Sequence, residues 1–313
     1  MVQNLVISFN AIFPMFLIIG AGYVIRKIGL LDDVTTKKVN NLTFRFFLPV
    51  LTFYNIYTTD SGEVFRPNLV VFSVLAIFIV FGLLWVIVPR FEKEDAKRGV
   101  IIQAIYRSNF IILGSPIAMA LAGEGEGGVV ALMIAFVIPV YNSLAVVCLE
   151  YWKDRKVSLG KTLKGIATNP LILSSLAGIL FLLLKIQLPE VLMSPVLQLK
   201  SVATPLALVV LGASLHLEQV KGNKRNLIIV VLGRLLLVPA AVLLPAAALG
   251  FRGIELITLL GIFASPTGVS SFTMAQQMGG DGELAGEAVV FTSLFSLFSM
   301  FFWTFLLKQL GMF

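Results

Sequence analysis

Long apolar stretches alternate with short polar connections along the whole chain. Ten apolar windows can be distinguished, at residues 5–25, 38–58, 69–88, 99–121, 129–151, 166–184, 195–215, 227–249, 255–278 and 284–307. Each is close to the roughly 20 residues that an α-helix needs to cross the hydrocarbon core of a bilayer. The pattern predicts an all-α polytopic membrane protein with ten transmembrane helices, numbered here as spans 1 to 10.

The basic residues are distributed unequally between the two sides of these spans. The connections after spans 1, 3, 5, 7 and 9 contain 16 Lys and Arg residues, whereas the opposite side contains 5. Cytosolic connections carry such an excess. We therefore expect a multi-pass protein of the cell inner (plasma) membrane, surrounded by the lipid bilayer, with both termini outside the cytosol.

The two halves of the chain carry prolines at matching positions. Three pairs are 156 residues apart and a fourth pair is 150 apart: Pro14 and Pro170, Pro49 and Pro205, Pro89 and Pro245, and Pro116 and Pro266. Five spans is an odd number, so the second half must enter the membrane in the opposite orientation. The pattern predicts two inverted five-helix repeats, residues 1–152 and 166–313, joined by a cytosolic linker at 153–165.

Spans 4 and 9 each contain a Ser-Pro step near their middle, Ser115-Pro116 and Ser265-Pro266. Proline removes a backbone donor and clashes with the preceding turn, so we expect both helices to break there. Paired broken helices in matching positions indicate the binding site of a transporter, and helix N-termini exposed by a break favour anions. The residues expected around this site are Asn109, Ser115, Pro116, Ser265, Pro266, Thr267 and Ser270. Tight packing through small residues is the alternative.

Three arginines fall inside apolar windows, and ionisable groups at membrane depth indicate function. Arg45 lies in span 2 and Arg107 in span 4, where either could pair with a substrate carboxylate. Arg234 in span 8 is nearer the cytosolic edge, and for it we favour helix packing or snorkelling. Asn142 in span 5 could face the breaks or form an interhelical hydrogen bond.

Composition narrows the possible functions. Hydrophobic residues make up 58% of the chain and charged residues 13%, whereas soluble domains carry about 25% charged residues. The net charge of +7 comes from basic connections, so we expect no nucleic-acid partner. The chain has one cysteine and one histidine and no nucleophile or metal motif with its required partners. Residues 123–128 spell GxGxxG, but no strand precedes them and two of them are acidic, so we expect a loop there and not a dinucleotide site. We expect no enzyme activity, no cofactor and no bound metal.

These features together resemble the auxin efflux carrier family, which includes malate and malonate permease-like proteins. The resemblance lies at residues 41–49 (NLTFRFFLP), 107–116, 265–267 and 275–281. It implies a fold like that of the bile-acid/sodium symporters, with a scaffold of spans 1, 2, 6 and 7 and a transport domain of spans 3–5 and 8–10. It also implies elevator-type alternating access, a homodimer, and a substrate at crossed spans 4 and 9. The positions carried over are Asn109, Ser115, Pro116, Ser265, Pro266 and Thr267. The embedded glutamate of sodium-coupled relatives is not evident here.

Three functional hypotheses follow. The first is a secondary transporter for a small organic anion, a mono- or dicarboxylate or an auxin-like acid, because the breaks and arginines occur without any central carboxylate. The second is a sodium- or proton-coupled symporter or antiporter on the same fold. The third is a membrane sensor or anchor that binds a cytosolic partner through residues 153–164.

Overall fold

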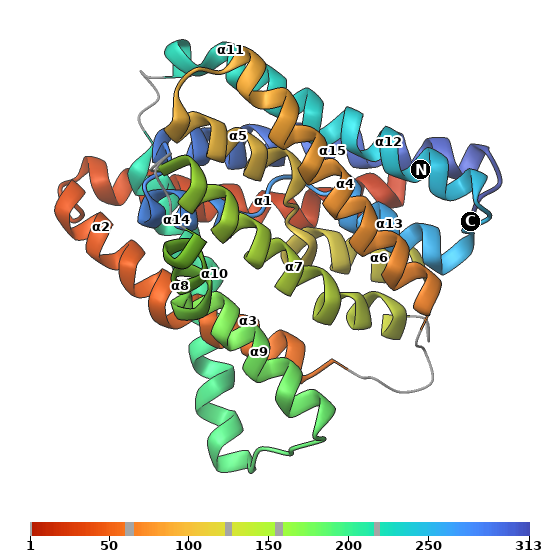
Figure 1. Cartoon of the computed structure of the whole chain (residues 1–313), viewed down its shortest axis with the longest axis horizontal. Helices are drawn as coiled ribbons and strands as arrows, with labels where there is room; N and C mark the ends of the chain where they lie inside the picture. The colour runs from red at the N-terminus through yellow and green to blue at the C-terminus, as the bar shows by residue number, and fades with distance from the viewer. Residues whose placement is uncertain (1, 60–65, 123–126, 154–158, 216–219) are drawn as a thin grey trace.

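A computed structural model describes residues 2–59, 66–122, 127–153, 159–215 and 220–313 (Figure 1). Apart from an isolated β-bridge, every regular element in these ranges is helical. The first half contains α1 (Val2–Lys27), α2 (Asp33–Leu42), η1 (Thr43–Phe47), α3 (Leu48–Tyr57), α4 (Pro67–Phe91), α5 (Asp95–Tyr106), η2 (Phe110–Gly114), α6 (Ser115–Ala122) and α7 (Gly127–Lys153). The second half contains α8 (Leu159–Thr168), α9 (Pro170–Leu183), α10 (Glu190–Ser214), α11 (Val220–Leu232), η3 (Gly233–Leu237), α12 (Val238–Ala248), α13 (Gly253–Ala264), α14 (Val269–Met278) and α15 (Gly282–Gln309).

Each of the apolar windows is occupied by helix. Within the described ranges, five continuous helices are long and apolar enough to cross a membrane: Pro67–Phe91, Gly128–Lys153, Glu190–Ser214, Gly222–Ala248 and Gly282–Gln309. These findings confirm an all-helical polytopic architecture. Helix α8 begins within the predicted linker 153–165, so that segment is helical from Leu159 on, and residues 154–158 lie outside the described part of the chain.

Within the described ranges, three π-helical turns interrupt the spans, and each lies immediately before an X-Pro step. They are η1 before Pro49, η2 before Pro116 and η3 before Pro239. Proline cannot donate to the carbonyl four residues earlier, and its ring clashes with that carbonyl, so the preceding turn widens. At Pro239 the freed carbonyl belongs to Leu235, and the indole Nε1 of Trp303 donates to it at 2.9 Å.

This widening corrects one expectation from the sequence. Span 4 was predicted to break at Ser115-Pro116, but the helix continues through Pro116 after the π-helical turn η2. The break lies earlier, at residues 107–109, between α5 and η2. In span 9 the break lies between α13 and α14, from Ser265 to Gly268, where Ser265-Pro266 predicted it.

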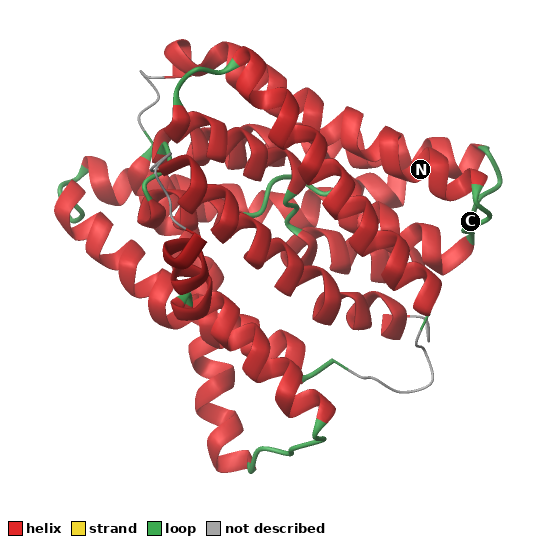
Figure 2. Cartoon of the chain, in the orientation of Figure 1, coloured by secondary structure: helices red, strands yellow, loops and turns green. Residues whose placement is uncertain are grey.

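The two interruptions meet at the centre of the molecule, where Figure 2 shows loops in the middle of the helical body. Ser108 and Thr267 form an antiparallel β-bridge there. Close helix packing supports the crossing, because a Cβ added to Gly114 would overlap the carbonyl oxygen of Gly261 and the Ser265 hydroxyl. The small residues of the two spans therefore let their backbones touch.

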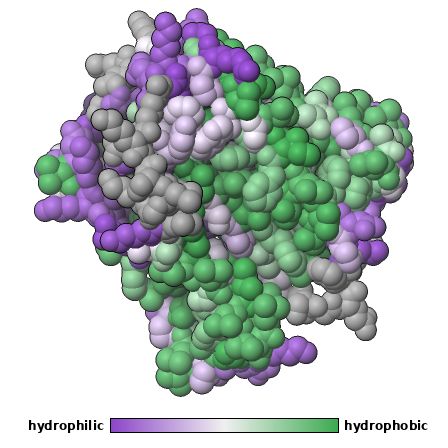
Figure 3. Space-filling view, in the orientation of Figure 1, coloured by the Kyte–Doolittle hydropathy of each residue, from purple (hydrophilic) through white to green (hydrophobic). Residues whose placement is uncertain are grey.

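The helices form two groups on either side of this crossing. Helix α3 packs on α9, and α10 packs on both α1 and α3, which places α3, α9 and α10 together in the lower part of Figure 1. The α4, α5, α7 and α11–α15 helices form the larger body. The visible face carries an apolar expanse between hydrophilic atoms at its left and right edges (Figure 3), as expected for a protein with its flanks in lipid.

Candidate functional site

The broken spans hold each other through their extended backbones. The amide of Asn109 donates to the carbonyl of Pro266 at 2.7 Å, and the amide of Gly268 donates to the carbonyl of Arg107 at 3.3 Å. The hydroxyl of Thr267 donates to the carbonyl of Ala104 at 2.7 Å. Backbone groups that leave a helix at membrane depth need such partners, because no water satisfies them there.

Arg234 caps both broken helices at once. Its Nε donates to the carbonyl of Ser265 at 2.7 Å, and its two terminal nitrogens donate to four further carbonyls, those of Ile105, Tyr106, Ile262 and Phe263, at 2.7–3.1 Å. A guanidinium has five N–H donors, so all of them are used on backbone. The side chain is 0% exposed and lies at the negative ends of two helix dipoles. Arg234 therefore stabilises the crossing, in agreement with the packing role that the sequence favoured.

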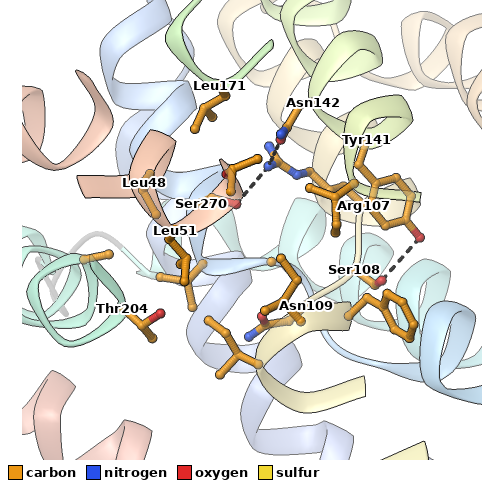
Figure 4. A pocket seen from close by; sticks show the side chains of 18 residues that line it. Leu48, Leu51, Arg107, Ser108, Asn109, Tyr141, Asn142, Leu171, Thr204 and Ser270 are labelled. Atoms are coloured by element: carbon orange, nitrogen blue, oxygen red, sulfur yellow. Dashed lines mark hydrogen bonds between the residues drawn. The ribbon is translucent and has the colours of Figure 1, made fainter. Parts of the chain in front are cut away.

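A cavity of about 60 Å³ lies beside the crossing (Figure 4). One wall comes from α3, α9 and α10, and the other from α7 and the residues at the two breaks. Among the described residues, no Asp or Glu lines it; the lining residues are Leu48, Leu51, Thr52, Arg107, Ser108, Asn109, Phe110, Ile111, Ile112, Ile138, Tyr141, Asn142, Leu171, Thr204, Ala207, Gly268, Val269 and Ser270. At about 10–15 Å³ for each water-sized probe, the cavity has room for roughly five small groups.

Arg107 is the charged group of this cavity. It is 4% exposed, and its terminal nitrogens donate to Asn142 Oδ1 at 2.6 Å, to Ser270 Oγ at 2.9 Å and to Met274 Sδ at 2.6 Å. All three partners are neutral, and a thioether sulfur is a weak acceptor. Within the described residues no carboxylate pairs with Arg107. The guanidinium thus has donors and charge left for an anionic ligand.

Asn109 supplies a second unused donor. Its side chain is 4% exposed and lines the cavity, and Nδ2 has no hydrogen-bond partner among the described residues. The first residues of two helices line the same space, from Phe110 in η2 and from Val269 in α14. Their first N–H groups lack intrahelical acceptors, and the dipole favours a negative group there.

The residues expected at the site fall into two groups. Four of them line the cavity: Arg107, Asn109, Asn142 and Ser270. The other six lie outside its lining: Arg45, Ser115, Pro116, Ser265, Pro266 and Thr267.

The six residues outside the lining have other surroundings. The Ser115 hydroxyl donates to the carbonyl of Ile111 at 3.0 Å, and that of Ser265 donates to the carbonyl of Gly261. The carbonyls of Ser265 and Pro266 and the hydroxyl of Thr267 are used within the crossing described above. Arg45 is exposed on η1.

The sequence reasoning missed the wall opposite Arg107 and the support of the break. Leu48, Leu51 and Thr204 come from helices far from the crossing in sequence. Leu48 and Thr204 directly precede the matched prolines Pro49 and Pro205, but that pattern indicated a repeat and not a cavity wall. Tyr141 was detectable in principle, because it precedes Asn142; its hydroxyl lies 3.2 Å from the hydroxyl of Ser108, which donates to it. Among the described residues no group of His, Cys, Asp or Glu could hold a metal ion.

Comparison with known proteins identifies the family. The profile of the family described as "Membrane transport protein" matches residues 7–304. A Rhizobium meliloti protein named "Putative malonate transporter" is 26% identical over 295 residues, which cover 91% of each chain. An uncharacterized transporter of Methanocaldococcus jannaschii is 23% identical over 316 residues, covering 96% of this chain and 99% of the relative. The chain is therefore a multi-pass membrane protein and not an enzyme, and it belongs to the membrane transport protein family, that of the auxin efflux carriers.

Proposed function

We propose that this protein is a secondary transporter for a small organic anion, with Arg107 as the carboxylate ligand. The observation that carries the proposal is a buried arginine in a cavity whose described lining residues include no acidic side chain. A guanidinium at membrane depth is costly and is normally paired. A substrate carboxylate would pair with it bidentately.

The surroundings of Arg107 favour a small acid. Asn109 Nδ2 and the N-termini of η2 and α14 provide further donors for a second carboxylate or a carbonyl. The cavity of about 60 Å³ suits a short mono- or dicarboxylate better than an indole acid. The name of the Rhizobium relative makes malonate the first substrate to try.

The transport mechanism that we propose uses ten spans as two inverted five-helix repeats. Spans 1, 2, 6 and 7 form the scaffold, and spans 3–5 and 8–10 form the transport domain that carries the crossing. The cavity has lining residues from α3, α9 and α10 on one side and from α7 and α14 on the other, which is the arrangement that elevator-type movement requires. We place the protein in the cell inner membrane as a homodimer, with both termini outside the cytosol.

Ligand-induced stabilisation of the purified protein tests this proposal. A ligand at 100 times its dissociation constant stabilises the native state by about 2.7 kcal/mol. We expect malonate to raise the unfolding temperature more than acetate, chloride or indole-3-acetate, each given as its choline salt. Hydrogen bonds to charged groups contribute about 1.5–3 kcal/mol each, so Arg107→Gln should weaken binding about tenfold to a hundredfold.

Arg90→Gln is the matched control, because Arg90 is an exposed arginine at the end of α4. The Arg90→Gln variant should bind malonate as the parent does. Vesicles reconstituted with the parent or with Arg90→Gln should both take up malonate. Equal binding by the Arg107 and Arg90 variants would contradict the proposal. Stabilisation by sodium or protons alone, without any carboxylate, would instead favour the cation-coupled alternative.

A further inference from the structure

A long apolar groove runs along the outside of the transport domain between α11 and α15. Its volume is about 710 Å³, and it is separate from the cavity beside Arg107. Apart from one lysine and one serine its lining is hydrophobic, and it comprises Lys224, Leu227, Ile228, Val231, Leu232, Leu235, Leu236, Phe291, Phe295, Phe298, Ser299 and Phe302. Phe295, Phe298 and Phe302 are 45%, 69% and 47% exposed, so the groove opens to the hydrocarbon region.

Hydrogen bonds join the two helices at both ends of this groove. Asn223 Nδ2 donates to Glu287 Oε2 at 2.8 Å, and Trp303 Nε1 donates to the carbonyl of Leu235 at 2.9 Å. The side chains between these contacts leave the groove open. These two contacts hold the helices on either side of the groove, and its apolar lining favours contact with an apolar chain.

The length of the groove matches one leaflet of a bilayer. From Lys224 to Leu236 the helix advances about 18 Å at 1.5 Å per residue. Half of the hydrocarbon core is about 15 Å thick. An acyl chain that lies in the groove would therefore place its headgroup beside Lys224.

Among the described lining residues of the groove, the positively charged one, Lys224, lies at this end. Lys224 is exposed and forms no ion pair within the described residues. Arg225 is its neighbour, with the guanidinium 6.0 Å from the ring centre of Phe91. The nearby Glu287 is buried, at 3% exposed; one of its carboxyl oxygens accepts a hydrogen bond from Asn223, and the other has no partner among the described residues. Basic pockets between membrane helices bind anionic lipid headgroups.

We propose that this groove, defined by the twelve lining residues above, binds one anionic glycerophospholipid. The acyl chain lies between α11 and α15, and the phosphate pairs with Lys224. This site is independent of the solute that the protein carries.

Lipid retention by the purified full-length protein tests the inference. Native mass spectrometry would compare phosphatidylglycerol with phosphatidylcholine of the same acyl chains. We expect phosphatidylglycerol to bind more tightly, and Lys224→Gln to weaken it about fivefold, as expected for one basic group at an anionic headgroup. Lys164→Gln is the matched control, because Lys164 is exposed on α8, away from the groove.

A second variant tests the acyl-chain part of the site. Val231→Trp places a large ring in the groove and should displace phosphatidylglycerol while malonate-induced stabilisation stays as in the parent. Equal affinity for both lipids in the parent and in Lys224→Gln would overturn the assignment of an anionic headgroup. Unchanged retention in Val231→Trp would show that the lipid binds elsewhere.

Discussion

Replacing Arg234 by lysine should destabilise the protein, because lysine has fewer N–H donors than arginine. The guanidinium donates to five carbonyls, at the C-terminal ends of α5 and α13. An ammonium has three donors, so at least two carbonyls would be left unpaired. Each unpaired carbonyl costs between about 0.6 kcal/mol, the value of a typical hydrogen bond between membrane helices, and about 3 kcal/mol, the cost of a fully desolvated polar group. For two carbonyls, the free energy of unfolding should fall by about 1–6 kcal/mol.

The free energy of unfolding in detergent micelles measures this loss. Native proteins are stable by about 5–15 kcal/mol, so Arg234→Lys should remain folded and melt at a lower temperature. Arg107→Lys is the matched control, because Arg107 forms three side-chain hydrogen bonds and an ammonium can replace them. That variant should lose malonate binding while its stability stays within about 1 kcal/mol of the parent.

Three outcomes of these measurements test the roles given to Arg234 and Arg107. If Arg234→Lys melts with the parent, the carbonyls find other donors and the arginine does not hold the crossing. If both lysine variants lose the same stability, the difference between a backbone-capping arginine and a ligand-binding arginine is refuted. An Arg234→Lys variant that is destabilised and still binds malonate would support the assignment of the two roles.

Three further predictions concern packing, charge and the cavity. Gly114→Ala should destabilise the protein by about 1–3 kcal/mol, because the added methyl group overpacks the crossing. Gly82 has open space around it, so Gly82→Ala should not destabilise the protein, and thermal melting of the two variants tests the difference. Burial alone would raise the pKa of Glu92, but hydrogen bonds from the Glu94 amide and Asn226 outweigh it and lower the pKa below 4.5. Glu92 therefore stabilises the folded state above about pH 4.5, and this contribution is lost as the pH falls through the lowered pKa. The melting temperature of Glu92→Gln should accordingly depend less on pH between 6 and 3, and equal dependence would contradict this. Asn109→Ala should weaken malonate binding less than Arg107→Gln does, because it removes a neutral donor and not a charged one. Titration of both variants with malonate measures this, and a greater loss of affinity in Asn109→Ala would contradict the proposal.

The helices could be predicted from the sequence because the bilayer restricts which backbone structures can cross it. Every backbone group in lipid must be paired internally, so apolar stretches of the right length become helices. The break in span 9 was also predictable, since Ser265-Pro266 opens an extended segment. The predicted orientation rests on loop charges, and the predicted inverted repeat rests on proline positions. The positions of the helices test neither of these two predictions.

The first break could not be predicted because proline does not always break a helix. At Pro116 the turn before it widens to η2 and the helix continues. The chain leaves the helix at Arg107–Asn109 instead, where the Asn109 amide finds the Pro266 carbonyl and Gly268 finds the Arg107 carbonyl. This position is fixed by a partner some 160 residues away, and no window of the local sequence contains that information.

The two buried arginines of this protein differ in how their N–H donors are used. Both lie at membrane depth beside the same crossing, and the sequence offered no reason to separate them beyond their distance from the cytosolic edge. Arg234 uses all five donors on carbonyls, so a ligand could approach it only by breaking those bonds. Arg107 uses three donors on neutral side chains and borders a cavity. We therefore propose that an anion binds at Arg107, which borders the cavity and has N–H donors left, and not at Arg234, whose five donors are already used.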